Sequence, residues 1–128
     1  MADILLVDDD ERLAELCAWF LTKGGHEVRT ACSYSDARER IAERAPELML
    51  ADLDLGAESG RVELARLAEE GILPPTLVVS GYLDGALSAE LEALGGVRGT
   101  LPKPFDPGEL AARVASCLAE GEEAEERA

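Results

Sequence analysis

The chain has 128 residues, of which 47% are hydrophobic and 30% charged, and its formal net charge is −15 at pH 7. This length and apolar content predict one folded domain with its own core, and they argue against an intrinsically disordered chain. The negative charge disfavours direct binding to nucleic acid or to an anionic membrane, and it favours a cationic partner surface or a divalent metal.

Five short apolar segments alternate with segments of helical periodicity. The apolar segments, each predicted to form a strand, are residues 4–7, 28–31, 48–51, 76–79 and 97–101. The other segments repeat apolar residues at spacings of three and four, which predicts five amphipathic helices. The first of these should end at Gly24 and bury a stripe formed by Leu13, Leu16, Cys17, Phe20 and Leu21.

The second and fifth helices have recognisable starts. Ser33 or Ser35 is available to cap the second helix, and Asp106 followed by Pro107 is typical of the start of the fifth. Alternation of strand and helix over the whole chain predicts an α/β fold, in which a doubly wound, five-stranded parallel sheet is covered by helices on both faces.

The remaining features concern the end of the chain and its compartment. Residues 1–120 are assigned to the domain, whereas the acidic segment 121–128 has no apolar stripe and is expected to be disordered. The sequence has no signal-peptide pattern and no apolar run of membrane-spanning length, and its three cysteines lack disulfide-framework spacing. We therefore expect a cytoplasmic protein with buried, reduced thiols.

Polar side chains follow the ends of four predicted strands. Asp8 and Asp9 come after the first strand, Asp52 after the third, Ser80 after the fourth and Lys103 after the fifth. Ligands of open parallel sheets bind beyond the carboxyl ends of the strands. We therefore expect three carboxylates, a hydroxyl and an ammonium group to meet at one edge of the sheet.

Three neighbouring carboxylates repel one another unless a cation lies among them. Mg²⁺ prefers octahedral coordination by oxygen. Asp8, Asp9 and Asp52 could supply carboxylate oxygens, and a backbone carbonyl near Asp54 could supply another. The sequence thus predicts a magnesium site, in which Mn²⁺ could replace Mg²⁺.

Metal binding alone does not require a lysine and a hydroxyl. Lys103 could pair with one oxygen of a phosphoryl group, and Ser80 could donate a hydrogen bond to another. One carboxylate would then be the nucleophile that forms an acyl phosphate. Asp52 is the best candidate because it follows the most apolar central segment, residues 48–51.

Four segments together resemble the motifs of bacterial response-regulator receiver domains. In order and spacing, these segments are LLVDDD, LMLADLDL, VVSGY and LPKPF. The resemblance runs from residue 3 to about residue 120 and suggests a single receiver domain similar to the chemotaxis regulators of two-component signalling. It implies a flavodoxin-like sheet in the strand order 2-1-3-4-5 with five helices on its two faces. Whether the domain stands alone or belongs to a larger regulator or hybrid kinase stays open.

The resemblance also implies roles for the acidic residues. Asp52 matches the phosphoacceptor of the family. Asp9 matches the direct Mg²⁺ ligand, and Asp8 matches its outer-shell neighbour. Asp54 matches the residue that offers its backbone carbonyl to the metal.

Other positions match the switch residues of the family or depart from them. Ser80 resembles the switch hydroxyl, and Lys103 resembles the invariant lysine that precedes a proline in what is often a cis peptide. Gly56 stands where the family usually has a proline, which should loosen the loop after the acceptor. Thr100 stands where the family usually has an aromatic switch residue, so we hypothesise that Tyr82 carries part of the signal.

The leading interpretation is a phosphorylation-activated switch that receives a phosphoryl group on Asp52, with Mg²⁺, from a sensor histidine kinase or a histidine phosphotransfer protein. It would assist its own phosphorylation and dephosphorylation without turning over an independent substrate. An unknown downstream protein would bind the face formed by the fourth helix, fifth strand and fifth helix. The alternatives are a small phosphohydrolase of the haloacid-dehalogenase type, which would use Asp52 and Asp54, and a phosphorylation-independent, receiver-like adaptor.

Overall fold

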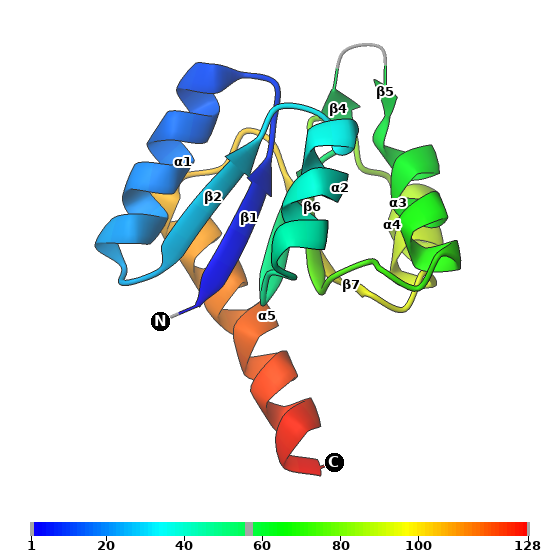
Figure 1. The fold of residues 1–128 in the computed structure, drawn as a ribbon. Coiled ribbons are helices and arrows are strands. Elements are labelled where there is room, and N and C mark those ends of the chain that lie inside the picture. The colour runs from blue at the N-terminus through cyan, green and yellow to red at the C-terminus, as the bar shows by residue number, and fades with distance from the viewer. Residues whose placement is uncertain (1, 56–57, 128) are drawn as a thin grey trace.

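A parallel five-stranded sheet forms the centre of the molecule (Figure 1). The computed structural model describes residues 2–55 and 58–127. Its main sheet has the order β2-β1-β3-β6-β7, and all neighbouring pairs are parallel. The five strands are β1 (Asp3–Val7), β2 (Glu27–Ala31), β3 (Leu48–Asp52), β6 (Thr76–Ser80) and β7 (Val97–Pro102).

A small antiparallel hairpin follows β3 and is separate from the main sheet. It consists of β4 (Asp54–Leu55) and β5 (Glu58–Ser59). Counted along the main sheet alone, the strand order is therefore 2-1-3-4-5, and the predicted topology is confirmed. Gly56, for which the sequence predicted a loosened loop, lies outside the described residues.

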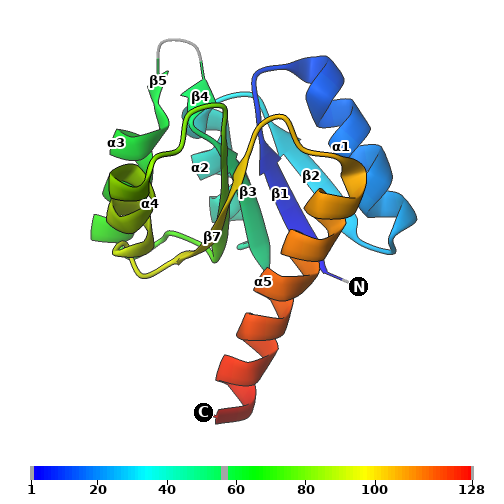
Figure 2. The same ribbon diagram turned by 180° about the vertical axis from the view of Figure 1, so that it is seen from behind.

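Five helices cover the two faces of the sheet. They are α1 (Glu11–Lys23), α2 (Tyr34–Glu43), α3 (Gly60–Glu69), α4 (Gly85–Glu92) and α5 (Pro107–Arg127). Helices α1 and α5 pack side by side on one face, and α2, α3 and α4 pack on the other (Figures 1 and 2). None of the helices in the described part of the chain has the length and apolar character needed to cross a membrane.

The strands are apolar because both faces of the sheet are covered. Successive side chains of a strand point to opposite faces. Ile4 and Leu6 belong to the core cluster under α1 and α5, whereas Leu5 and Val7 belong to the cluster under α2, α3 and α4. The central strands β1, β3 and β6 are almost entirely buried, and their buried carboxylates and hydroxyl at the predicted site lie at or just beyond their carboxyl ends.

Helix α1 ends where the sequence indicated, and its start is capped by Asp10. The Asp10 carboxylate accepts hydrogen bonds from the backbone N–H groups of Arg12 (3.1 Å) and Leu13 (3.2 Å) and so caps the helix. The C-cap is Gly24. The acidic residues 8–11 after β1 therefore have two roles: Asp10 starts α1, whereas Asp8 and Asp9 are the predicted site residues.

The predicted buried stripe of α1 was partly wrong. The buried residues are Ala14, Cys17 and Leu21, whereas the side chain of Leu16 is 53% exposed. The stripe that faces the sheet is narrower than the sequence suggested, because small residues at positions 14 and 17 bring the helix close to the strands. Leu16 then lies on the outer side of the helix.

The starts of α2 and α5 also follow the capping signals. The Ser33 hydroxyl accepts a hydrogen bond from the N–H of Asp36 at 3.0 Å, which decides between the two candidate caps of α2. Asp106 accepts from the N–H of Glu109 at 2.8 Å, immediately before Pro107. Both caps satisfy backbone donors that the first helical turn leaves without partners.

Helix α5 is longer than the assigned domain. Its helical backbone continues to Arg127, beyond residue 120, and disorder of segment 121–128 stays a prediction. Alanine and glutamate favour the helix, and extending an existing helix avoids the cost of nucleating a new one. The last turns of α5 extend beyond the edge of the sheet in both views (Figures 1 and 2).

The three cysteines are free, as predicted, but only two of them are buried. Cys17 and Cys117 lie in the core under α1 and α5. Cys32 is exposed because it lies in the short connection between β2 and α2 rather than on a strand.

An ion-pair network ties β1, β2 and the end of α2 together at the edge of the sheet where β1 begins. The Arg29 guanidinium donates to both carboxylate oxygens of Asp3, at 3.1 and 3.0 Å, and to the backbone carbonyls of Arg40 and Arg44. The Arg44 side chain donates to the same carboxylate at 2.9 Å. The Asp3 side chain is 14% exposed, so these charge-assisted bonds are only weakly screened by solvent.

We predict that Asp3→Asn lowers the free energy of unfolding by about 1–3 kcal/mol, because it removes the carboxylate partner of Arg29 and leaves Arg44 with Glu27 alone. Urea unfolding at pH 7 measures the loss. Glu27→Gln is the matched control, since Glu27 pairs with the same Arg44 but is 68% exposed, and it should cost less than about 0.5 kcal/mol. Equal losses in the two variants would contradict this account.

Candidate functional site

Four strand ends place the predicted residues at one edge of the sheet. Asp8 and Asp9 directly follow β1, Asp52 ends β3, Ser80 ends β6 and Lys103 directly follows β7. The strands are parallel and neighbouring, so their carboxyl ends lie together. The sheet thus brings five side chains from distant parts of the chain into one region.

Asp52 is held by donors from three parts of the chain. Its side chain is 3% exposed, and its Oδ2 lies 2.7 Å from the Lys103 ammonium nitrogen. Its Oδ1 accepts the backbone N–H of Asp54 at 2.9 Å, and its backbone carbonyl accepts the hydroxyl of Tyr34 at 2.8 Å. Each carboxylate oxygen therefore has a donor, which orients the group.

Lys103 provides the positive charge of the site. Burial lowers the pKa of its ammonium group, but the hydrogen bond that it donates to Asp52 and the charges of Asp52, Asp8 and Asp54 outweigh burial, so the pKa is raised overall. The group is consequently charged at neutral pH. The peptide bond between Lys103 and Pro104 is cis, as the resemblance implied.

For Asp8, burial decides the direction in which the pKa shifts. Burial, and to a smaller extent the charge of Asp52 and a hydrogen bond with it, raise the pKa of its carboxyl group from 3.8 to about 6. A hydrogen bond from the backbone N–H of Asp10 at 2.9 Å and the charge of Lys103 work against this rise. The site therefore holds more negative charge than its single ammonium group can compensate.

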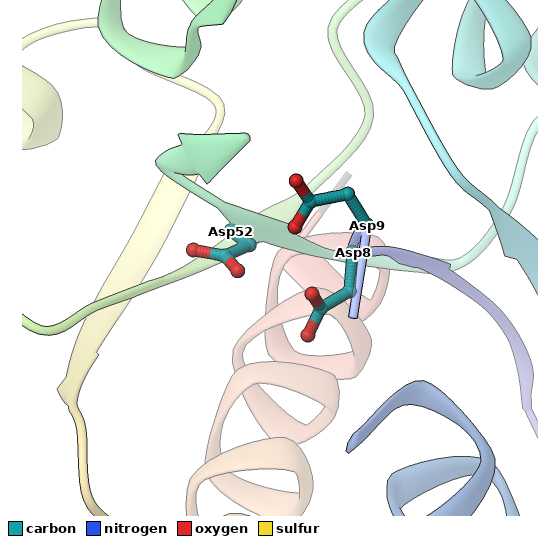
Figure 3. A group of neighbouring side chains, drawn as sticks. All are labelled: Asp8, Asp9 and Asp52. Atoms are coloured by element: carbon teal, nitrogen blue, oxygen red, sulfur yellow. The ribbon is translucent and has the colours of Figure 1, made fainter. Parts of the chain in front are cut away.

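Asp8, Asp9 and Asp52 form a cluster that suits a small divalent cation (Figure 3). One carboxylate oxygen from each of the three lies within 4.8 Å of the others. Two oxygens that ligate Mg²⁺ at about 2.1 Å are separated by at most about 4.2 Å. The cluster thus fits Mg²⁺ if one carboxylate moves slightly closer to the other two, or if one carboxylate binds the metal through a water molecule, as expected for Asp8. The backbone carbonyl of Asp54 as a further ligand stays a prediction.

The Asp54 side chain makes a contact that the sequence did not indicate. The Ser80 hydroxyl lies 3.3 Å from each of the two carboxylate oxygens of Asp54, and the backbone N–H of Gly81 donates to Oδ2 at 3.0 Å. The Ser80 Oγ also accepts the N–H of Tyr82 at 3.1 Å. Ser80 is therefore bound to the segment around it and to Asp54.

The two remaining candidates lie at the margin of the site. The Tyr82 side chain is 72% exposed and lines an open pocket of about 460 Å³ together with Asp54, Ser80 and residues of α3 and α4. Thr100 lies within β7, and its backbone carbonyl accepts a hydrogen bond from the Arg113 side chain at 3.0 Å. A role for either residue in switching stays a prediction.

Sequence reasoning missed two residues that shape the site. Tyr34 is fully buried and fixes the Asp52 carbonyl; helical spacing could have indicated its burial but not its partner. Gly60 begins α3, where an added Cβ would lie 2.7 Å from Leu53 Cα and 3.0 Å from the Tyr34 hydroxyl. A glycine is required there because no side chain fits between these groups.

Cys17 lies beside the cluster but takes no part in its chemistry. It lines a small cavity together with Asp8, Asp52 and Lys103. Burial, and then the charge of Asp8, raise the pKa of its thiol to about 11. The group therefore stays a thiol at neutral pH rather than a reactive thiolate.

We predict that Asp8→Asn stabilises the metal-free domain by about 1–2 kcal/mol at pH 8 and that the gain fades toward pH 4. Above pH 6 the carboxylate is charged in both the folded and the unfolded chain, and the folded chain bears the cost of burial. Between about pH 6 and 3.8 the folded chain takes up the proton first, so this cost disappears as the pH falls. An asparagine oxygen can still accept the N–H of Asp10.

Urea unfolding in EDTA at pH 8 and pH 4.5 measures the difference between Asp8→Asn and wild type. The control is Asp10→Asn, an exposed position where asparagine still caps the helix, and it should stay within about 0.5 kcal/mol of wild type at both pH values. A stability gain for Asp8→Asn that does not depend on pH would contradict the conclusion that the folded structure raises the pKa of Asp8.

Comparison with known proteins agrees with this geometry. Residues 4–115 match the response regulator receiver domain family. The alkaline phosphatase synthesis transcriptional regulatory protein PhoP of Bacillus subtilis (strain 168) is 30% identical over 122 residues, which are 93% of this chain and 49% of PhoP. The chain thus spans about half the length of this curated relative.

Solved structures support the same conclusion. The receiver domain of NtrX from Brucella abortus superposes with a TM-score of 0.81 at 28% identity, covering 91% of this chain and 98% of that one. A CheY-like response regulator receiver domain protein from Methanospirillum hungatei JF-1 has a TM-score of 0.86 at 24% identity, covering 97% and 98%, and supports the fold alone.

Receiver domains are signalling proteins that are generally not classed as enzymes. They bind Mg²⁺ at an acidic pocket and interact with histidine kinases or phosphotransfer proteins. Because the family match covers most of the sequence, the chain belongs to the response regulator receiver domain family, whose members are phosphorylation-activated switches of two-component systems.

Proposed function

We propose that Asp52 is the phosphoacceptor of this switch. The observation that carries the proposal is the ion pair between the buried Asp52 and the half-buried Lys103, joined at 2.7 Å beside the carboxylates of Asp8 and Asp9. This arrangement combines an oriented nucleophile, a fixed positive charge and a set of metal ligands. Phosphoryl transfer depends mainly on such positioning and charge compensation.

The donor in this proposal is a phosphohistidine of a sensor kinase or phosphotransfer protein. A carboxylate oxygen of Asp52 attacks phosphorus and forms the P–O bond of an acyl phosphate, while the P–N bond to the histidine breaks. The electron pair of that bond stays on the imidazole nitrogen, which takes up a proton. Lys103 then pairs with a phosphoryl oxygen, since its raised pKa keeps it charged.

Asp8, Asp9, Asp52 and the backbone carbonyl of Asp54 would hold the metal ion. When bound, Mg²⁺ or Mn²⁺ neutralises charge on the phosphoryl oxygens. Binding of a metal ion by the aspartates would therefore allow an anionic phosphoryl group to enter a site that is already rich in carboxylates.

The readout of phosphorylation is assigned to the face formed by α4, β7 and α5. Ser80 ends β6, and residues 81–84, which we call the β6–α4 loop, connect it to α4. A phosphoryl group that draws in the Ser80 hydroxyl would move this loop and the adjoining face, where a downstream protein would bind. Thr100 has no ring to relay the change, so the exposed Tyr82 in the loop is the proposed signal carrier.

The two alternative functions have less support. A phosphohydrolase of the haloacid-dehalogenase type would need Asp54 as a general acid or base, whereas its carboxylate is engaged by Ser80 and Gly81. An adaptor that ignored phosphorylation would have no need of a buried lysine–aspartate pair or of neighbouring metal ligands.

We predict that wild-type protein incubated with Mg²⁺ and acetyl phosphate gains one phosphoryl group, which mass spectrometry locates on Asp52. Asp52→Asn removes the nucleophile and should give no adduct, whereas Asp10→Asn should label like wild type because Asp10 only caps α1. Labelling of Asp52→Asn, or no labelling of wild type, would contradict the proposal. Sustained turnover of a phosphate ester that is lost in Asp52→Asn would instead indicate a phosphohydrolase.

We predict that Tyr82→Ala weakens transmission from the site to the α4, β7 and α5 face. Amide NMR spectra recorded with Mg²⁺ and beryllofluoride, a phosphoryl mimic, should show smaller shift changes on that face than in wild type. Shift changes at Lys103 should be retained, because the variant leaves the acceptor site intact. Tyr82→Phe keeps the ring and serves as the control. Unreduced shift changes in Tyr82→Ala would rule out Tyr82 as the signal carrier.

A further inference from the structure

The Asp54 carboxylate already engages two donors that a phosphoryl group would use. The Ser80 hydroxyl lies 3.3 Å from both of its oxygens, and the Gly81 N–H donates to Oδ2 at 3.0 Å. A hydroxyl and a backbone N–H directed at one anionic group form an arrangement that stabilises oxyanions in general. In the unphosphorylated domain, the anion in this arrangement is the Asp54 carboxylate.

The Ser80 hydroxyl cannot serve two anions at once. A serine hydroxyl has a single proton to donate, for which the Asp54 oxygens (3.3 Å) and the backbone carbonyl of Tyr82 (3.2 Å) are alternative acceptors, and Oγ itself accepts the Tyr82 N–H. Donation to a phosphoryl oxygen therefore requires that the contact with Asp54 is given up. The two anions would also repel each other if both stayed near the same donors.

We propose that the Asp54 side chain is a built-in competitor of the phosphoryl group, which holds Ser80 and Gly81 in the unphosphorylated domain and must be displaced when Asp52 is modified. This inference rests on the proposed function of Asp52. It makes Asp54 a positioning residue with two separable proposed roles: its backbone carbonyl is a proposed metal ligand, and its carboxylate opposes the switch.

The surroundings of Asp54 allow such a displacement. Its side chain is exposed and lines the open pocket of about 460 Å³ that lies between the hairpin, α3 and α4. The carboxylate can therefore swing into solvent without disturbing the core. Because Gly81 belongs to the β6–α4 loop, release of its N–H frees the same loop that the proposed switch moves.

The test measures the affinity of beryllofluoride at saturating Mg²⁺ by calorimetry. Asp54→Ala removes the competitor but keeps the backbone carbonyl, and it should bind about five- to tenfold more tightly than wild type, as expected for loss of a charge-assisted contact. Glu90→Gln is the charge-matched control, because Glu90 lines the same pocket but pairs with Arg61. It should change the affinity less than about twofold.

A double-mutant cycle separates competition for hydrogen bonds from simple charge removal. In a Ser80→Ala background one of the contested donors is absent, so the gain from Asp54→Ala should shrink markedly. In addition, without any ligand, Asp54→Ala should move the Gly81 amide proton resonance upfield, because that proton loses its carboxylate acceptor. An unchanged urea midpoint establishes that the variant is folded.

The outcomes are distinct. Tighter binding by Asp54→Ala that is absent from Glu90→Gln and reduced by Ser80→Ala supports the inference. An equal gain in Glu90→Gln, a gain that does not depend on Ser80, or unchanged binding overturns it while the proposed function stands. No binding to wild type, or binding that persists undiminished in Asp52→Asn, overturns the proposed function and this inference with it.

Discussion

The imbalance of charge at the carboxyl edge of the sheet governs the rest of the site. One ammonium group, on Lys103, lies among the carboxylates of Asp8, Asp9 and Asp52. Two like charges about 4 Å apart repel by roughly 4 kcal/mol where the effective dielectric constant is about 20. The lysine compensates one carboxylate. The pKa of Asp8 is raised mainly by burial and, to a smaller extent, by the charge of Asp52. In the proposed function, a divalent cation would offset the remaining negative charge, so that the site could accept a dianionic phosphoryl group.

The fold allows this arrangement because it places the charged groups of the site at or just beyond the carboxyl ends of the strands. Apolar side chains fill both faces of the sheet, and β3 is buried along its whole length. Asp52 lies at the end of this central strand, flanked by the ends of β1 and β6. Asp52, the proposed acceptor, is thus shielded from bulk water and yet lies close to groups carried by the ends of other strands.

The loops around this centre connect the charge balance to movement. The carboxylate of Asp54 lies between the acceptor and the β6–α4 loop, and its contacts with Ser80 and Gly81 hold that loop in the unmodified domain. With Thr100 in place of an aromatic residue on β7, the exposed Tyr82 in the same loop offers the more direct path to the outer face. The proposed change is therefore a local exchange of hydrogen bonds around Ser80 and Gly81.

The sequence by itself determined the five strands, the capped helix starts and the meeting of Asp8, Asp9, Asp52 and Lys103, because apolar periodicity and parallel strand ends follow from local pattern alone. Only the tertiary structure decided which donors each carboxylate binds, that Leu16, Cys32 and Tyr82 are exposed, and that Tyr34 supports the acceptor. The physical reason is that periodicity specifies which face of an element is apolar, whereas hydrogen-bond partners depend on loop paths and side-chain rotamers that packing selects between segments distant in the chain.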